Sequence, residues 1–179
     1  MVEIDESVVR ACQKYFPITT TGLTDPRVSL RFEDGLAYVK NTEKIYDLII
    51  VDSTDPVGPG EGLFSMEFYQ NCHRILSEEG ILINQHESPY FEKESNEMKR
   101  AHKKIKSLFE IAEVYQAFIP TYPSGHWLFG FASKKYHPLV DFKKPYIHEI
   151  GYDTKYYNEA LHKGCFALPN YVRKQLEKV

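Results

Sequence analysis

The sequence is poor in cysteine and has no clustered metal ligands. Its 179 residues include three cysteines, Cys12, Cys72 and Cys165, which are far apart and form no CxxC pair. The seven histidines are spread singly, with no HxxxH or HExxH arrangement. An odd number of scattered cysteines is typical of a reducing compartment. The sequence therefore predicts a cytoplasmic protein without a metal site.

The sequence also lacks an excess of either charge and any long apolar run. Its 22 Lys and Arg residues are scattered among 25 Asp and Glu residues, and the formal net charge is -3. This balance argues against nucleic acid or anionic lipid as a partner. No apolar stretch approaches the length of a membrane span, and the start, MVEIDESVV, does not resemble a signal peptide. We therefore expect neither a membrane nor a nucleic-acid partner.

The sequence does contain enough apolar residues to form a hydrophobic core. Hydrophobic residues make up 42% and aromatic residues 14% of the chain, which predicts one globular domain over residues 1–179. The nearly continuous apolar strand 45–52, IYDLIIVD, is typical of a parallel sheet with helices on both faces. Later strands at 111–119 and 127–133 flank the turn PTYPSGH and predict an antiparallel pair that closes the sheet edge. We therefore expect an α/β fold.

The remaining expected elements follow from helical or alternating apolar spacing. The segment STDPVGPGEG is dense in Pro and Gly and is predicted to be a loop. A second loop is expected at 19–26. The other expected elements are strands at 1–5, 28–33 and 80–87 and helices at 5–16, 35–40, 65–76, 92–109, 155–162 and 170–177.

Acidic residues lie at the ends of predicted strands, where ligands bind in open α/β sheets. A carboxylate after the second strand of a nucleotide-binding sheet accepts hydrogen bonds from both ribose hydroxyls. Glu3 is therefore a ribose candidate if the first strand here is the second strand of the fold. For Asp5, a helix-capping role is equally consistent with the pattern VEID.

Two further carboxylates, Asp52 and Asp55, lie just beyond the apolar strand and are three residues apart. Like charges held this close raise each other's proton affinity, so the pair favours a cationic guest. Asp-Pro is also a common way to open a turn, and Asp55 precedes Pro56. A diamine-binding pair and a pair of solvated acids are therefore both consistent with the spacing.

At this segment the chain resembles the polyamine aminopropyltransferases, the spermidine synthase family. DSTDPVGPGEGLFSMEFY resembles the family signature, and VEID, EDG, GILINQHESPY, IPTYPSGHW and the tail TKYYNEALHKGCFALPNYV match the family in the same order. The resemblance spans essentially the whole chain. It implies transfer of the aminopropyl group of decarboxylated S-adenosylmethionine to putrescine, giving spermidine and methylthioadenosine. It also implies a Rossmann-like sheet of the S-adenosylmethionine-dependent methyltransferase type.

The resemblance assigns a role to each residue of the diamine side. Asp52 matches the general base, which takes a proton from the substrate ammonium. Asp55 matches the acid that binds the diamine, helped by Gln85 and by Tyr122, whose hydroxyl orients the attacking nitrogen. From the residues alone, Gln85 can equally cap a strand end and Tyr122 can be a packed turn aromatic. The two prolines that flank Tyr122 favour a rigid wall of the site.

On the nucleoside side, the resemblance assigns Glu3 to the ribose, Asp34 and the following Gly35 to the adenine end, and Pro59 to an apolar contact with the adenine. No permanently bound cofactor is expected, because decarboxylated S-adenosylmethionine is a co-substrate. The family also has an N-terminal β-rich domain and a GGGDGG-like loop, which this sequence lacks. We therefore expect an incomplete Rossmann-like sheet, and either a homo-oligomer or a complementing N-terminal chain as the protein partner.

Two other functions are consistent with the sequence. A methyltransferase that uses S-adenosylmethionine has the same type of sheet, although paired Asp52 and Asp55 suit a diamine better than a neutral acceptor. A catalytically inactive fragment, or a subunit of a split enzyme, would keep the binding surface without turnover. Preference between S-adenosylmethionine and its decarboxylated form separates the two enzymes. The length of the acceptor amine is not defined by the sequence.

Overall fold

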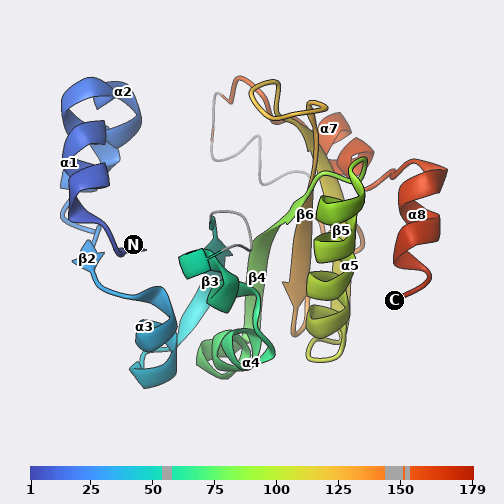
Figure 1. Ribbon diagram of the computed structural model, residues 1–179, viewed down its shortest axis with the longest axis horizontal. Coiled ribbons are helices and arrows are strands. Elements are labelled where there is room, and N and C mark those ends of the chain that lie inside the picture. The colour runs from blue at the N-terminus through green and yellow to red at the C-terminus, as the bar shows by residue number, and fades with distance from the viewer. Residues whose placement is uncertain (54–57, 144–150, 152–153) are drawn as a thin grey trace. The chain divides into compact units, whose positions relative to one another are not determined.

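The computed structural model describes residues 1–53, 58–143, 151 and 154–179 (Figure 1). The chain divides into two compact units, Met1–Glu43 and Lys44–Val179. Each unit has a sheet of its own. The expectation of one domain over residues 1–179 stays a prediction.

The first unit is built around a short parallel strand pair. Glu3 in the first of these strands lies opposite Phe32 in the second. Parallel strands need a long crossover, and helices supply it here. The predicted loop at 19–26 contains the end of one of these helices and a 3₁₀ helix. The elements are β1 (Val2–Glu3), α1 (Glu6–Tyr15), α2 (Pro17–Thr20), η1 (Thr21–Thr24), β2 (Arg31–Phe32) and α3 (Gly35–Asn41).

Asp5 determines where α1 begins. Its Oδ1 accepts a hydrogen bond from the backbone N–H of Ser7 at 2.8 Å and a second from the Ser7 hydroxyl. These bonds stabilise the carboxylate and hold the pKa of Asp5 below its usual value. The helix-capping interpretation of Asp5 is confirmed.

The second unit has a four-stranded sheet in the order β3-β4-β6-β5. β4 pairs with β3 in parallel, whereas β6 pairs antiparallel with both β4 and β5. Three strands therefore run in one direction, and the predicted mostly parallel sheet with an antiparallel pair is confirmed. β6 lies inside the sheet and β5 forms its edge. The strands are β3 (Tyr46–Val51), β4 (Leu76–Glu87), β5 (Ile111–Phe118) and β6 (His126–Ser133).

Helices lie on both faces of this sheet. On one face, Met98, Val114, Leu128 and Val172 form a buried cluster that joins α5, β5, β6 and α8. On the other face, Phe166 at the end of α7 contacts aromatic rings of β5 and β6. The helices are η2 (Gly58–Phe64), which falls in a predicted loop, α4 (Met66–Ile75), α5 (Glu92–Lys106), α7 (Glu159–Cys165), which lies later than the predicted 155–162, and α8 (Asn170–Leu176).

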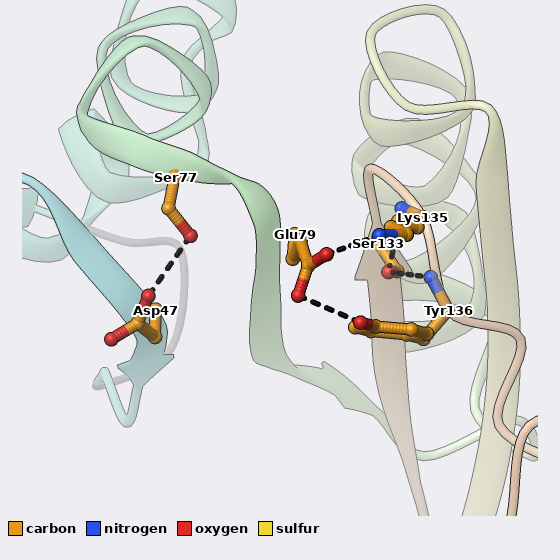
Figure 2. A network of polar contacts seen from close by, with 6 residues as sticks. All are labelled: Asp47, Ser77, Glu79, Ser133, Lys135 and Tyr136. Carbon is orange, nitrogen blue, oxygen red and sulfur yellow. Dashed lines mark hydrogen bonds and ion pairs between the residues drawn. The ribbon is translucent and has the colours of Figure 1, made fainter.

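β4 begins at Leu76, four residues before the predicted start, because polar side chains hold its irregular first segment (Figure 2). The Ser77 hydroxyl donates to Asp47 Oδ1 of β3 at 3.0 Å. On the other side, Glu79 accepts from the hydroxyl of Tyr136 at 2.7 Å and from the ammonium of Lys135. These bonds join the segment to strand β3 and to the residues that follow β6.

Candidate active site

Three residues predicted for the diamine side lie at the carboxyl edge of the four-stranded sheet. Val51, the last residue of β3, pairs with Asn84 of β4. Asp52 and Gln85 therefore follow a paired position in two neighbouring parallel strands. Tyr122 lies in the turn between β5 and β6, which reaches the same edge because β6 runs antiparallel to β4. Ligands of α/β sheets bind at this edge.

For two other predicted residues, Asp55 and Pro59, the structure does not describe the side chain. Asp55 lies outside the described residues. Pro59 belongs to η2, of which the structure describes the backbone at this position. The predicted partnership of Asp52 with Asp55 and the predicted contact of Pro59 with adenine therefore stay predictions.

β4 ends in a bulge next to Gln85. Gln85 pairs with Phe129 and Glu87 with Leu128, so His86 is the extra residue of the strand. The Gln85 side-chain amide donates to Glu87 Oε1 at 3.3 Å. Glu87 is 2% exposed and adds a buried carboxylate to the edge.

Sequence reasoning gave Glu87 no role, although it stands two residues after Gln85 in the quoted motif GILINQHESPY. The signal that points to it is structural. Its φ is 70°, in the left-handed region that residues other than glycine rarely occupy. Such residues are concentrated at functional sites.

The turn that carries Tyr122 has a well-defined backbone. Tyr122 N–H donates to the Ile119 carbonyl, and Gly125 N–H donates to the Tyr122 carbonyl, each at 3.0 Å. Its ring packs on buried Trp127, with centroids 4.5 Å apart, yet the residue stays 46% exposed. Tyr122 is thus a packed turn aromatic and also presents a surface at the edge, so both interpretations fit its geometry.

The Tyr122 turn is joined to the end of β4 by two hydroxyls. Ser88, directly after Glu87, is fully buried, and its Oγ lies 3.1 Å from Ser124 Oγ. The Tyr90 backbone N–H donates to the same Ser88 oxygen at 3.3 Å. The segments that carry Glu87 and Tyr122 are therefore held together by a direct hydrogen bond.

Three of the nucleoside-side candidates lie in the first unit, at the carboxyl ends of its paired strands. Glu3 Oε1 accepts from the Asp5 backbone N–H at 3.0 Å. Asp34 Oδ1 accepts from the Leu36 backbone N–H at 2.9 Å and so caps α3, whose first residue is Gly35. Glu3, Asp34 and Gly35 thus lie at the carboxyl edge of the small sheet of the first unit.

The part of the chain that the structure describes offers no cluster of three or more His, Cys, Asp or Glu side chains that could hold a metal ion. No helix in that part is long and apolar enough to cross a membrane. The three cysteines are free thiols, and burial raises the pKa of Cys72 to about 12. Cys72 therefore stays a protonated, unreactive thiol at neutral pH.

A buried polar network lies behind this edge, on the face of β4 covered by α4 and α5. Asn84 Nδ2 lies 3.0 Å from His86 Nδ1 and 3.4 Å from the Tyr69 hydroxyl. The His86 ring packs edge-on against His102 of α5, with centroids 5.7 Å apart. Burial lowers the pKa of His86 to about 3 and that of His102 to about 4. Both rings are therefore neutral at pH 7.

These two histidines predict that the second unit loses stability as the pH falls. In the unfolded chain a histidine titrates near pH 6.5, so between about pH 6.5 and 4 the unfolded state binds protons that the folded state does not. Together, His86 and His102 are expected to lower the free energy of unfolding by about 4 kcal/mol between pH 7 and 5. Urea unfolding at both pH values measures this change.

The variant His102→Gln serves as the internal comparison, because it removes one titrating group. It is expected to reduce the loss of stability by about half. His73 and His126, whose pKa values burial also lowers, contribute with the same sign. A free energy of unfolding equal at pH 7 and 5 would contradict the prediction.

The chain is similar in sequence and in structure to known proteins. The model of the spermine/spermidine synthase domain matches residues 1–144. A polyamine aminopropyltransferase of Clostridium perfringens is 65% identical, over 100% of this chain and 63% of the relative. A spermidine synthase crystallised with the transition-state analogue AdoDATO is 40% identical, with a TM-score of 0.94 over 99% of this chain and 60% of the other. Human methyltransferase-like protein 13, in complex with SAH, shares the fold alone, at 19% identity and a TM-score of 0.56 over 99% and 70%. The chain thus spans about 63% of the length of the curated relatives it matches.

Proposed function

The chain belongs to the spermine/spermidine synthase family, and from this premise we propose that the protein transfers the aminopropyl group of decarboxylated S-adenosylmethionine to putrescine. The observation that supports this most directly is the pairing of Val51 in β3 with Asn84 in β4, the last pair between these two strands. Asp52 and Gln85 are the next residues of the two chain segments. A carboxylate and an amide at adjacent strand ends are suited to an alkylammonium group.

The proposed chemistry begins with the protonation state of the diamine. An aliphatic amine has a pKa of about 10.4, so putrescine arrives as an unreactive ammonium. In the proposal the Asp52 carboxylate holds the ammonium and accepts one proton, which frees the nitrogen lone pair. The nitrogen attacks the methylene carbon next to the sulfonium. A C–N bond forms while the C–S bond breaks, and the electron pair of that bond goes to sulfur, giving spermidine and methylthioadenosine.

The other groups of the diamine side are proposed to bind and orient the acceptor. Asp55 and Gln85 are proposed to accept hydrogen bonds from its ammonium groups. The Gln85 amide donates to the buried carboxyl group of Glu87, which is proposed to belong to the same site. The Tyr122 hydroxyl is proposed to direct the attacking nitrogen toward the sulfonium. Holding the reacting atoms in line in this way lowers the entropic part of the barrier.

On the nucleoside side, we assign Glu3 to both ribose hydroxyls and Asp34 to the adenine amino group. Oδ1 of Asp34 already caps α3 in front of Gly35, so the proposed bond uses the other carboxylate oxygen. Pro59 is proposed to contact the adenine ring. The nucleoside is a co-substrate that is consumed, and no resident cofactor takes part.

The proposal includes a protein partner or a further segment that completes the sheet. β3 is one of the two edge strands of the described sheet in the second unit. Apolar side chains are exposed along this strand: Leu48 is 51% and Ile50 66% exposed, and Ile45, just before the strand, is 62% exposed. An apolar edge strand is a surface that proteins normally pair or cover. A further copy of this chain or a complementing N-terminal chain is the partner that we propose for this edge.

The test is product analysis with both nucleosides. The chain, alone and fused to the N-terminal part of the Clostridium perfringens relative, is incubated with putrescine and either decarboxylated S-adenosylmethionine or S-adenosylmethionine. Spermidine and methylthioadenosine in a 1:1 ratio, formed with the decarboxylated nucleoside alone, are expected by mass spectrometry. A methylated product, or the absence of spermidine from both forms of the protein, would refute the proposal.

A further inference from the structure

The bulge at the end of β4 is a strained feature in the middle of the diamine side. Between Gln85 and Glu87 the strand advances two residues while β6 advances one. Glu87 has a φ of 70° although it is not glycine. Strained backbone of this kind persists only where the surrounding structure holds it in place. The shape of the bulge therefore depends on the contacts around it.

Asn84 contacts the bulged residue His86 and the residue just before it. Its Nδ2 donates to the Gln85 carbonyl at 3.2 Å and lies 3.0 Å from His86 Nδ1. Because an amide N–H is a donor, Nδ1 of His86 acts as the acceptor and the ring proton lies on Nε2. Asn84 and His86 are 2% and 1% exposed, so these bonds are shielded from competing water.

Gly130 of β6 leaves the space that this arrangement needs. Gly130 pairs with Asn84 across the ladder. A Cβ at this position would overlap Asn84 Oδ1 and the His86 ring, and would lie 2.9 Å from His86 Nδ1. On its other side the ring packs against His102, with centroids 5.7 Å apart. The His86 ring thus lies in a close-fitting buried site bounded by Asn84, Gly130 and His102.

We propose that His86 is a positioning residue for the acceptor amine. Its contacts lie on the face of β4 that is covered by α4 and α5, and it acts by holding the bulge in the shape that brings the Gln85 amide to the Glu87 carboxylate. A change at His86 therefore alters the direction of both side chains at the edge. The inference rests on the proposed function, because it assigns Gln85 and Glu87 to the diamine.

Two substitutions separate the hydrogen bond of His86 from its volume. His86→Phe keeps a buried ring but offers no acceptor to Asn84, whereas His86→Asn keeps an acceptor near the position of Nδ1. In the form of the protein that makes spermidine, His86→Phe is expected to raise KM for putrescine about tenfold, as the loss of one buried hydrogen bond implies. KM for decarboxylated S-adenosylmethionine should stay within about twofold, and His86→Asn should restore KM for putrescine to within about threefold of the unaltered value.

The control for general destabilisation is Ile105→Val, in the buried face of α5 and 1% exposed. It is expected to lower the melting temperature and leave both KM values unchanged. If His86→Phe does not fold, Gly130→Ala takes its place, because the added methyl group presses on Asn84 and His86. The same selective rise in KM for putrescine is expected.

The outcomes separate this inference from the proposed function. An unchanged KM for putrescine in His86→Phe or in its replacement, an equal rise in both KM values, or no recovery in His86→Asn would overturn the positioning role. Absence of spermidine formation by the unaltered protein would instead refute the proposed function. In that case putrescine titrations followed by calorimetry, in the unaltered protein and in His86→Phe, test the inference: equal affinities, or no binding to either, overturn it.

Discussion

Replacing Asp52 by asparagine is expected to lower kcat for spermidine formation by about 10³-fold, because a general base typically contributes about 10²–10⁴ to the rate. Asparagine has the shape of aspartate and can hold a hydrogen bond, but it cannot take the ammonium proton. Asp52 is exposed directly after the last residue of β3, so the substitution should not disturb the core. Initial rates with saturating putrescine and decarboxylated S-adenosylmethionine measure the effect.

Asp47→Asn provides a matched control in the same strand. Asp47 is also exposed, but it lies five residues earlier, near the start of β3, where it accepts from the Ser77 hydroxyl (Figure 2). Its replacement is expected to change kcat by less than about twofold, since exposed substitutions away from a site have small effects. Equal losses in the two variants would point to a general charge effect. A kcat in Asp52→Asn within about tenfold of the unaltered value would remove Asp52 as the base.

The parts of the fold that sequence predicted well are those fixed by local patterns. The apolar run 45–52 predicted a parallel strand, and β3 spans Tyr46–Val51 and pairs in parallel with β4. The burial that the run predicted is not found, because β3 is an edge strand of the described sheet and none of its residues is buried. The helix that starts after Ser65 was predicted from its apolar stripe, and the Ser65 hydroxyl caps it by accepting from the Phe68 N–H at 3.1 Å. Periodicity and capping act within a few residues, so they are visible in the chain itself.

The start of β4 shows what local patterns miss. After Leu76, its first residues are the polar SEE and then Gly80, which is typical of a turn. The structure extends the strand through them because Glu79 bonds to Lys135 and Tyr136, 56 and 57 residues later. Contacts at that separation override local preference, and nothing in the segment itself indicates them.

The same division applies to the candidate site. Strand-end reasoning singled out Asp52, whereas Gln85 and Tyr122 were expected only from the family resemblance. The structure brings all three to the carboxyl edge of the four-stranded sheet. The bulge that orients Gln85 could not be predicted, since it depends on a fit between His86 and Gly130, which are 44 residues apart in the sequence and meet only when β6 pairs with β4. The position of β6 inside the sheet is likewise a property of strand order rather than of sequence pattern.

Replacing Met98 by alanine is expected to lower the free energy of unfolding of the second unit by about 3 kcal/mol. Met98 is fully buried in α5 and belongs to the cluster with Val114, Leu128 and Val172. The lost side chain leaves a cavity among four elements that close packing keeps from collapsing fully. Because Val172 is the buried residue of α8, that helix should lose protection from amide hydrogen exchange first.

Met66→Ala is the matched control, since it removes the same atoms from an exposed position. Met66 is the first residue of α4 and is 37% exposed. Its replacement is expected to change the free energy of unfolding by less than about 0.5 kcal/mol. Urea unfolding of the two variants at pH 7, where the buried histidines do not contribute to the difference, gives both values under one condition. Similar losses for Met66→Ala and Met98→Ala would contradict the placement of Met98 in the core, because only a cavity makes the same deletion costly.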